Sequence, residues 1–266
     1  TFTFTTAEAP KVEIIISGEG DVFVDGGTKL EQTGEPIILP VDYEYSLTLT
    51  LVPKTGYHLE ITGCGGEEDS DKGIYTTGEV KENCEIHVDF KIDTFDISSE
   101  IDGFGGNIVL NTTQADYGSS VSFSVIPESG YTLNANNLQS NCSLRLGTSA
   151  NQYLLKNITT NCTISASFNI QQPLLTVLPQ DSIAKISYPP FDNNNLQYAI
   201  CYYQSQSVTD INLESCFNEE GELKLAYNIL PDSEIKNIQN GNNYGFSLVV
   251  YDNRTGFSAG TLGTIQ

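Results

Sequence analysis

Two short stretches of the chain repeat the same phrase. Leu51–Leu59 reads LVPKTGYHL, and Val125–Leu133 reads VIPESGYTL. The proline, the Gly-Tyr pair and the apolar frame are shared, whereas the central charge is reversed from Lys54 to Glu128. A catalytic motif is rarely duplicated with its charge inverted, but a structural turn tolerates such a change because only its Pro, Gly and apolar positions matter. The repeat therefore predicts tandem structural modules.

The duplication extends far beyond this phrase. The matching positions lie 74 residues apart up to Leu59, and 78 apart afterwards, as though four residues were inserted around Asn134–Asn137. Two successive units of about 80 residues are expected from such self-similarity. The pairs after the insertion are Cys64 and Cys142, Tyr75 and Tyr153, Asn83 and Asn161, Cys84 and Cys162, Phe90 and Phe168, and Ile92 and Ile170.

Each unit has the alternation of β-strands. Apolar side chains occupy every second position over 47–51 and again over 121–125, which predicts half-buried antiparallel strands that end at Pro53 and Pro127. The closing strands alternate in the same way, and Cys84 and Cys162 share the parity of their apolar positions. Both cysteines are therefore expected on the core face.

The six cysteines divide evenly along the chain, with one local pair in each third. Spacing alone permits 15 connectivities, but the repeat favours local pairing. We expect the disulfides Cys64–Cys84, Cys142–Cys162 and Cys201–Cys216. Zinc would require closely spaced Cys or Cys/His clusters, which the sequence lacks, so an oxidising compartment is the better interpretation.

The charge is strongly negative, with a formal net value of −22. Residues 1–93 alone carry 19 acidic residues against 6 lysines. Such a field repels phosphate backbones and anionic membranes, so nucleic-acid partners are not expected. No apolar run is long enough to predict a transmembrane segment. The chain does not begin with Met and has no signal-peptide pattern, so it reads as a processed or excised segment of a secreted protein.

The two units resemble the bacterial surface repeat related to the internalin B-repeat. The resemblance rests on SGEGDVFV at Ser17–Val24, on DYGSSVSFSVIPESGYTL from Asp116, and on NITTNCTISASF at Asn157–Phe168. The first copy departs from the pattern by its acidic loop. Its closing strand, VKENCEIHVDF at Val80–Phe90, also lacks a Thr of the pattern. The closing strands of both copies carry a Cys that is unusual for the family. The resemblance implies β-grasp-like modules that act as spacers or adhesive units, and it transfers no catalytic residue.

The pattern changes from Pro173. The stretches Ile186–Gln204 and Ile235–Gly260 resemble a fibronectin type III or immunoglobulin-like domain. Tyr188 stands where that family usually has Trp, and Tyr244 follows an Asn-Gly turn as the corner tyrosine of such sandwiches does. Strand parity places Cys201 on the outward side of its strand.

The expected fold is all-β, with two tandem β-grasp-like repeat modules followed by a fibronectin-like β-sandwich. The predicted boundaries are 1–92 for the first repeat module, 93–171 for the second and 172–266 for the sandwich.

Enzyme signatures are hard to find, and we predict no catalytic residues. The two histidines, His58 and His87, face Thr132 and Ser165 in the second copy, so a duplicated active site would have lost its base. Gly103-Phe-Gly-Gly lacks the strand–helix setting and the lysine of a phosphate loop. No cofactor is expected.

The acidic loop Gly65–Gly73 is the one candidate metal site. Its carboxylates could coordinate Ca²⁺, but the spacing is not that of a calcium loop, and the second copy lacks the acids, so a solvated hairpin loop is the favoured alternative. The candidate ligands are Glu67, Glu68, Asp69 and Asp71.

These patterns predict a non-catalytic, secreted or cell-surface bacterial protein that works as an adhesin, stalk or spacer in an oxidising compartment. The alternative is an accessory region of a larger secreted hydrolase that binds a glycan or a protein, and a stand-alone enzyme is a third possibility. The partner is expected to be a protein or glycan at a surface, without further identity. Tyr43, Tyr45 and the pair Tyr202-Tyr203 could stack on a sugar, although the match of Tyr43 with Tyr117 favours a structural role.

Overall fold

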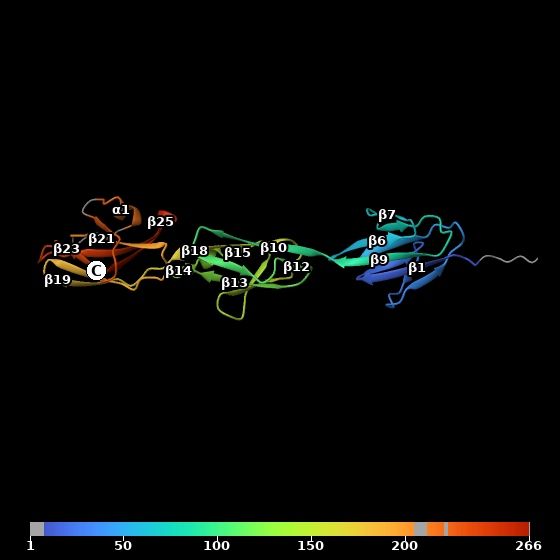
Figure 1. Ribbon diagram of the computed structural model, residues 1–266, viewed down its shortest axis with the longest axis horizontal. Helices are drawn as coiled ribbons and strands as arrows, with labels where there is room; N and C mark the ends of the chain where they lie inside the picture. The colour runs from blue at the N-terminus through green and yellow to red at the C-terminus, as the bar shows by residue number, and fades with distance from the viewer. Residues whose placement is uncertain (1–7, 205–211, 221–222, 266) are drawn as a thin grey trace, which may run out of the picture. The chain divides into compact units, whose positions relative to one another are not determined.

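The computed structural model describes residues 8–204, 212–220 and 223–265 (Figure 1). Within these residues the regular structure is strand, apart from one short α-helix and one 3-10 turn, which confirms the all-β class. The chain divides into two compact units, one with the residues up to Ile97 plus 112–121 and 155–162, the other with 98–111, 122–154 and the residues from Thr163. Because this division passes through the second predicted module, the module boundaries stay predictions.

The N-terminal part folds into two sheets, of orders β4-β1-β9-β6 and β3-β2-β5-β8-β7. In the first sheet β1 and β9 are parallel, and the other pairs are antiparallel. The strands are β1 (Lys11–Gly18), β2 (Gly20–Val24), β3 (Thr28–Leu30), β4 (Ile37–Pro40), β5 (Thr48–Pro53), β6 (Tyr57–Gly63), β7 (Glu67–Asp69), β8 (Ile74–Thr76) and β9 (Cys84–Ile92).

The next stretch repeats this order. Its sheets are β12-β10-β18-β14, in which β15 also pairs with β18, and β11-β13-β17-β16. These strands are β10 (Thr94–Asp102), β11 (Gly106–Leu110), β12 (Gln114–Asp116), β13 (Val121–Pro127), β14 (Tyr131–Leu133), β15 (Gln139–Ser140), β16 (Ser143–Leu146), β17 (Gln152–Lys156) and β18 (Cys162–Ile170). The 3-10 turn Ala135–Asn137 lies in the predicted four-residue insertion.

The buried side chains alternate along the strands as the sequence predicts. Leu49 and Leu51 are buried on β5, and Phe123 and Val125 are buried on β13, while their neighbours are more accessible. This spacing of two follows from the pleat of a strand, which points successive side chains to opposite faces. The cysteines of the closing strands lie as predicted. Cys84, bonded to Cys64, packs against the N-terminal core. Cys162 is buried.

The C-terminal part is a sandwich of a three-stranded sheet, β19-β20-β23, and a four-stranded sheet, β22-β21-β24-β25. Ala184, Ile186 and Ile235 from the first sheet pack with Ile200 and Leu248 from the second in one core. The strands are β19 (Thr176–Gln180), β20 (Ile183–Ser187), β21 (Leu196–Tyr203), β22 (Lys224–Tyr227), β23 (Glu234–Lys236), β24 (Gly245–Asp252) and β25 (Gly256–Ile265).

The outward side of β21 is also covered, which corrects one expectation. Cys201 does lie opposite the sandwich core, but it is fully buried. It is bonded to Cys216 on helix α1 (Leu213–Phe217). The two cysteines belong to a second small core, which also contains Ala199 and Val249 and is covered by this helix. The alternation of β21 gave the correct face, but it could not show that a helix closes over that face.

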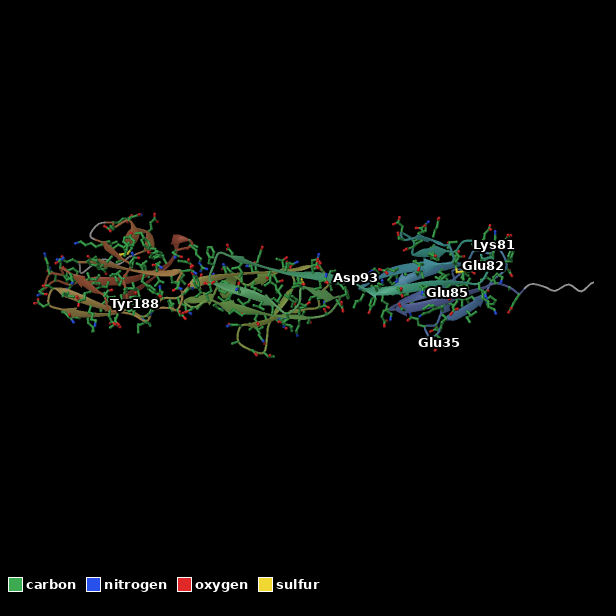
Figure 2. The ribbon with its side chains drawn as sticks, in the orientation of Figure 1. Glu35, Lys81, Glu82, Glu85, Asp93 and Tyr188 are labelled. Atoms are coloured by element: carbon green, nitrogen blue, oxygen red, sulfur yellow. A yellow bond between two sulfur atoms is a disulfide. The ribbon has the colours of Figure 1, made fainter. Side chains whose placement is uncertain are left out.

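Two tyrosines hold the sandwich as predicted. Tyr188, labelled in Figure 2, is buried, donates a hydrogen bond of 2.5 Å to the carbonyl of Ile229 and stacks on Tyr198. The hydroxyl of Tyr244 accepts a hydrogen bond of 3.0 Å from the backbone N–H of Gln239, five residues upstream. This second bond has the form of a tyrosine corner.

Candidate functional site at the repeated turns

The duplicated phrase forms the same turn in both copies. The N–H of Tyr57 donates to the carbonyl of Lys54 at 3.0 Å, and that of Tyr131 donates to Glu128 at 3.0 Å. The intervening Gly56 and Gly130 have φ values of +83° and +86°. Such backbone conformations favour glycine because a Cβ would meet the neighbouring carbonyl.

Each turn also binds the chain that leaves the closing strand. The N–H of Asp93, the residue after β9 that Figure 2 labels, donates to the carbonyl of Gly56 at 2.8 Å. In the second copy the N–H of Gln171, directly after β18, donates to the carbonyl of Gly130 at 2.8 Å. The same backbone bond therefore fixes the exit direction of the chain twice.

The two turn glycines also face bulky side chains from the segment that follows. A Cβ on Gly56 would lie 2.2 Å from the ring of Tyr117, and one on Gly130 would lie 2.4 Å from Leu196 and 2.8 Å from Phe191. Only a residue without a side chain fits at these contacts. We call Gly56 with Asp93 and Tyr117 the first joint, and Gly130 with Gln171, Phe191 and Leu196 the second joint.

The second joint has additional polar contacts. The hydroxyl of Ser129 accepts from the backbone N–H of Asp192 at 3.1 Å. The side-chain amide of Asn193 donates to the carbonyl of Ser129 at 3.1 Å and to the carboxylate of Glu128 at 3.2 Å. The turn is thus held by backbone and side-chain bonds to the loop that precedes β21.

A charged group lies beside the second joint, and we call it the Arg254 cluster: Phe104, Glu128, Tyr131, Asp252 and Arg254. The guanidinium of Arg254 binds the Asp252 carboxylate at 2.6–3.0 Å and reaches Glu128 at 3.1 Å. It also lies 4.5 Å from the centre of the Phe104 ring, within the range of a cation–π contact. The hydroxyl of Tyr131 donates to Asp252.

Burial makes this cluster stronger than a surface ion pair. The Asp252 side chain is 1% exposed and that of Arg254 is 24% exposed. Burial opposes ionisation of Asp252, but hydrogen bonds from Arg254 and Tyr131 outweigh it and hold the pKa of this carboxyl below its usual value. Burial, together with the bond to Asp252, raises the pKa of the Tyr131 hydroxyl well above its usual value. Asp252 is therefore an anion held by the Tyr131 hydroxyl and by the guanidinium and backbone N–H of Arg254.

The corresponding position of the first joint has only exposed pairs. Lys54 forms an ion pair with Glu19 at 2.5 Å, and both side chains are more than half exposed. The Nδ1 atom of His58 lies 2.8 Å from the Asp93 carboxylate, again at the surface. Pairs of this kind contribute little to stability because water and salt screen them.

The acidic loop is a short hairpin in which β7 pairs with β8. Glu67, Glu68 and Asp69 follow one another along the strand, so their side chains alternate between faces, and Asp69 pairs with Lys72 at 2.6 Å. No group of three His, Cys, Asp or Glu side chains in the described part of the chain is placed to hold a metal ion. Calcium binding here, with Asp71 as the fourth ligand, stays a prediction from the sequence.

The two histidines lie apart. His58 is on β6 beside Asp93, and His87 is on β9, 3.6 Å from Glu85. The cysteines offer no thiol, because all six are disulfide-bonded. The bridges Cys64–Cys84 and Cys201–Cys216 have Cα–Cα distances of 5.3 and 5.9 Å, and the bonded cysteines also include Cys142 and Cys162.

The sequence did not single out Arg254, Asp252 or Phe104, and it assigned no partner to Glu128. Glu128 is 39% exposed and bonded to Arg254. The reversal from Lys54 to Glu128 was the available signal, since a changed charge at a matched turn position indicates a changed partner. The partner itself lies 126 residues away in the chain and has no local signature.

No helix in the described residues is long and apolar enough to cross a membrane.

Comparison with known proteins gives no family. No family model matches the chain, and no curated protein matches it. Among solved structures, the FN1–FN3 domains of chicken CNTN1 align with 94% of this chain and 99% of theirs, at 8% identity and a TM-score of 0.24. Domains A168–A170 of titin align with 80% of this chain and 90% of theirs, at 8% identity and a TM-score of 0.23. Scores this low carry no argument about function.

Proposed function

We propose that this chain is a non-catalytic spacer built from consecutive β-modules, and that it serves as an adhesin or stalk in a secreted or cell-surface bacterial protein. One observation carries the proposal: the same Pro-x-x-Gly-Tyr turn closes both joints. At each joint a glycine carbonyl holds the exiting chain, and the glycine itself packs against a side chain of the next segment. A spacer needs joints that resist bending, and these contacts supply that resistance.

The disulfides support the location that this function requires. Structural disulfides persist in oxidising compartments and are rare in the cytosol. Small β-modules also have limited cores, and a covalent bridge within each one offsets that limit. Cys64–Cys84 lies against the N-terminal core, and Cys201–Cys216 holds α1 on the sandwich.

The spacer function is tested by loosening the joints in the full chain. Val at Gly56 or Gly130 would clash with the next segment, so we expect broader small-angle X-ray scattering distance distributions and faster proteolysis at 92–94 and 171–173. Val at Gly26 or Gly241 is the matched control, because these glycines also have positive φ (+73° and +86°) but meet no atom within 4 Å. Unchanged scattering and cleavage in both joint variants would refute the proposal.

A groove on the C-terminal sandwich favours the alternative function, an accessory module that binds a glycan. The groove has a volume of about 530 Å³ and combines the aromatic side chains of Tyr202, Tyr203 and Tyr244 with Lys224 and Lys236. Aromatic faces stack on sugar rings, and lysines favour a sugar that carries a carboxylate.

A glycan array with neutral and uronic-acid oligosaccharides tests this alternative. We expect retention of acidic sugars that is lost in Tyr203→Ala and Lys224→Ala. Tyr227→Ala is the matched control, because Tyr227 is exposed on the same sheet but does not line the groove. Binding that survives both groove variants, or no binding at all, would contradict a glycan site here.

A further inference from the structure

Tyr43 lies in a well-defined turn of the N-terminal part. The N–H of Glu44 donates to the carbonyl of Val80 at 2.9 Å, and the N–H of Val80 donates back to Tyr45 at 3.0 Å. The turn is closed by the N–H of Tyr45, which donates to the carbonyl of Asp42 at 3.1 Å. Glu44 has a φ of +65°, so the turn presents Tyr43 at its tip in a fixed backbone conformation.

The turn that carries Tyr117 is the same turn, bond for bond. The N–H of Gly118 donates to the carbonyl of Ile158 at 2.7 Å, and the N–H of Ile158 donates back to Ser119 at 3.1 Å. The N–H of Ser119 donates to the carbonyl of Asp116 at 3.1 Å. Gly118 has a φ of +73°, matching Glu44. The two tyrosines therefore occupy equivalent places in equivalent frames.

The difference between the two tyrosines is what covers them. Tyr117 is half-buried, and its ring lies against Gly56 of the first Pro-x-x-Gly-Tyr turn. Its N–H is also held by the carbonyl of Asp93 at 2.8 Å. Tyr43 is 63% exposed. Tyr43 therefore has the backbone setting that Tyr117 has in the first joint, but no glycine turn of the described residues packs against its ring.

We propose that Tyr43 is a docking surface for the Pro-x-x-Gly-Tyr turn of a further module of the same repeat type, placed before residue 8. The occupant follows from the filled example, in which the Tyr117 ring packs against the bare α-carbon of Gly56. A second copy of this chain is not the fitting partner. Its own two turns already pack against Tyr117 and against Phe191 with Leu196, so it would have to open a joint to dock.

Charge indicates which variant of the turn fits better. Asp42 and Glu44 flank Tyr43, so a turn with a lysine, as at Lys54, complements the surface, whereas a turn with a glutamate, as at Glu128, would be repelled. The inference rests on the proposed spacer function and deepens it, because it adds an identified kind of neighbour to the chain.

The test inserts a second copy of residues 8–92 between residues 7 and 8 of the full chain. The inserted copy is 85 residues long, which is the period of the repeat at its opening strand. The backbone N–H of Lys11 donates to the side chain of Asn83, and the backbone N–H of Asp96, 85 residues later, donates in the same way to Asn161. The inserted copy carries Tyr43→Phe, so that the peptide with Tyr43 comes from the original module alone. We expect tetranitromethane to nitrate this Tyr43 several-fold more slowly in the extended chain than in the natural one, as measured by peptide mass mapping. Tyr117 is the internal reference for a covered tyrosine.

Two variants of the inserted copy make the test specific. Gly56→Val in that copy should restore nitration of Tyr43, whereas Gly26→Val, which has the same backbone strain but no neighbour, should leave Tyr43 protected. Equal nitration in the natural and extended chains, or protection that survives Gly56→Val, would overturn the proposal. If Tyr43 stays reactive while Gly56→Val in the natural chain loosens the first joint, the docking surface fails and the spacer function stands.

Discussion

The two joints share a backbone plan but differ in what reinforces it. Both use a left-handed glycine, a bond from its carbonyl to the exiting chain, and contact with a side chain of the following segment. The first joint adds exposed ion pairs around Lys54 and His58, whereas the second adds the partly buried Arg254 cluster. The duplicated turn thus supplies the geometry, and the residues around it set the strength of each joint.

The largest effect is expected from removing the cation of the second joint. Arg254→Ala would leave the Asp252 carboxylate buried without its counter-charge, which costs about 3 kcal/mol in such pairs. Chemical denaturation of the full chain should show this loss in the transition of the C-terminal part. Lys54→Ala is the matched control and should leave the curve unchanged; equal effects would erase the distinction between the joints.

The hydroxyl of Tyr131 gives a second way to separate the joints. Tyr131→Phe removes the donor to Asp252, and hydrogen bonds to charged groups are worth about 2 kcal/mol. Tyr57→Phe at the matched position should be nearly neutral. Calorimetric unfolding of both variants checks this, and a larger loss in Tyr57→Phe would reverse the comparison.

Alanine at the turn glycines separates backbone strain from packing. Left-handed backbone costs an alanine about 1–2 kcal/mol at any such site. At Gly130, the clash with Leu196 and Phe191 should add about 1–3 kcal/mol, as overpacking does. Gly241 has the same φ of +86°, but no atom of the described residues lies within 4 Å of where its Cβ would be, so Gly241→Ala should show the cost of backbone strain without a packing clash. Equal denaturation midpoints for the two variants would show that the packing contact is unimportant.

Acid should weaken the second joint selectively. The folded pKa of Asp252 is below its usual value of about 3.9, so its stabilisation is fully present above about pH 4 and is lost as the pH falls through the folded pKa. Cleavage by pepsin within 170–175, compared with cleavage within 92–97 over this range, should rise first at the second site. Arg254→Ala should abolish that difference between the sites, and its persistence would assign it to another group.

Local patterns were sufficient for the strands and turns. The alternation around Leu49 and Phe123, the prolines that end β5 and β13, and the glycines of the turns all act within a few residues, so their consequences are legible in the sequence. The pairing of Cys201 with Cys216 was also expected, because the repeat favours local disulfides in the first two units and leaves these two cysteines for each other. The covered face of Cys201 was missed, because the helix that covers it follows a stretch with no clear periodicity.

What the sequence by itself determined is the repeat: the all-β class, the paired strands and a Pro-x-x-Gly-Tyr turn whose central charge differs between the two copies. Only the tertiary structure decided what that turn does, because its partners lie far along the chain, Tyr117 for Gly56 and Phe191 for Gly130. The Arg254 cluster likewise joins residues more than 120 positions apart. Contacts between residues so far apart in the chain depend on how complete sheets pack. The tertiary structure also shows that Tyr43 is exposed, although it matches Tyr117 in the sequence repeat.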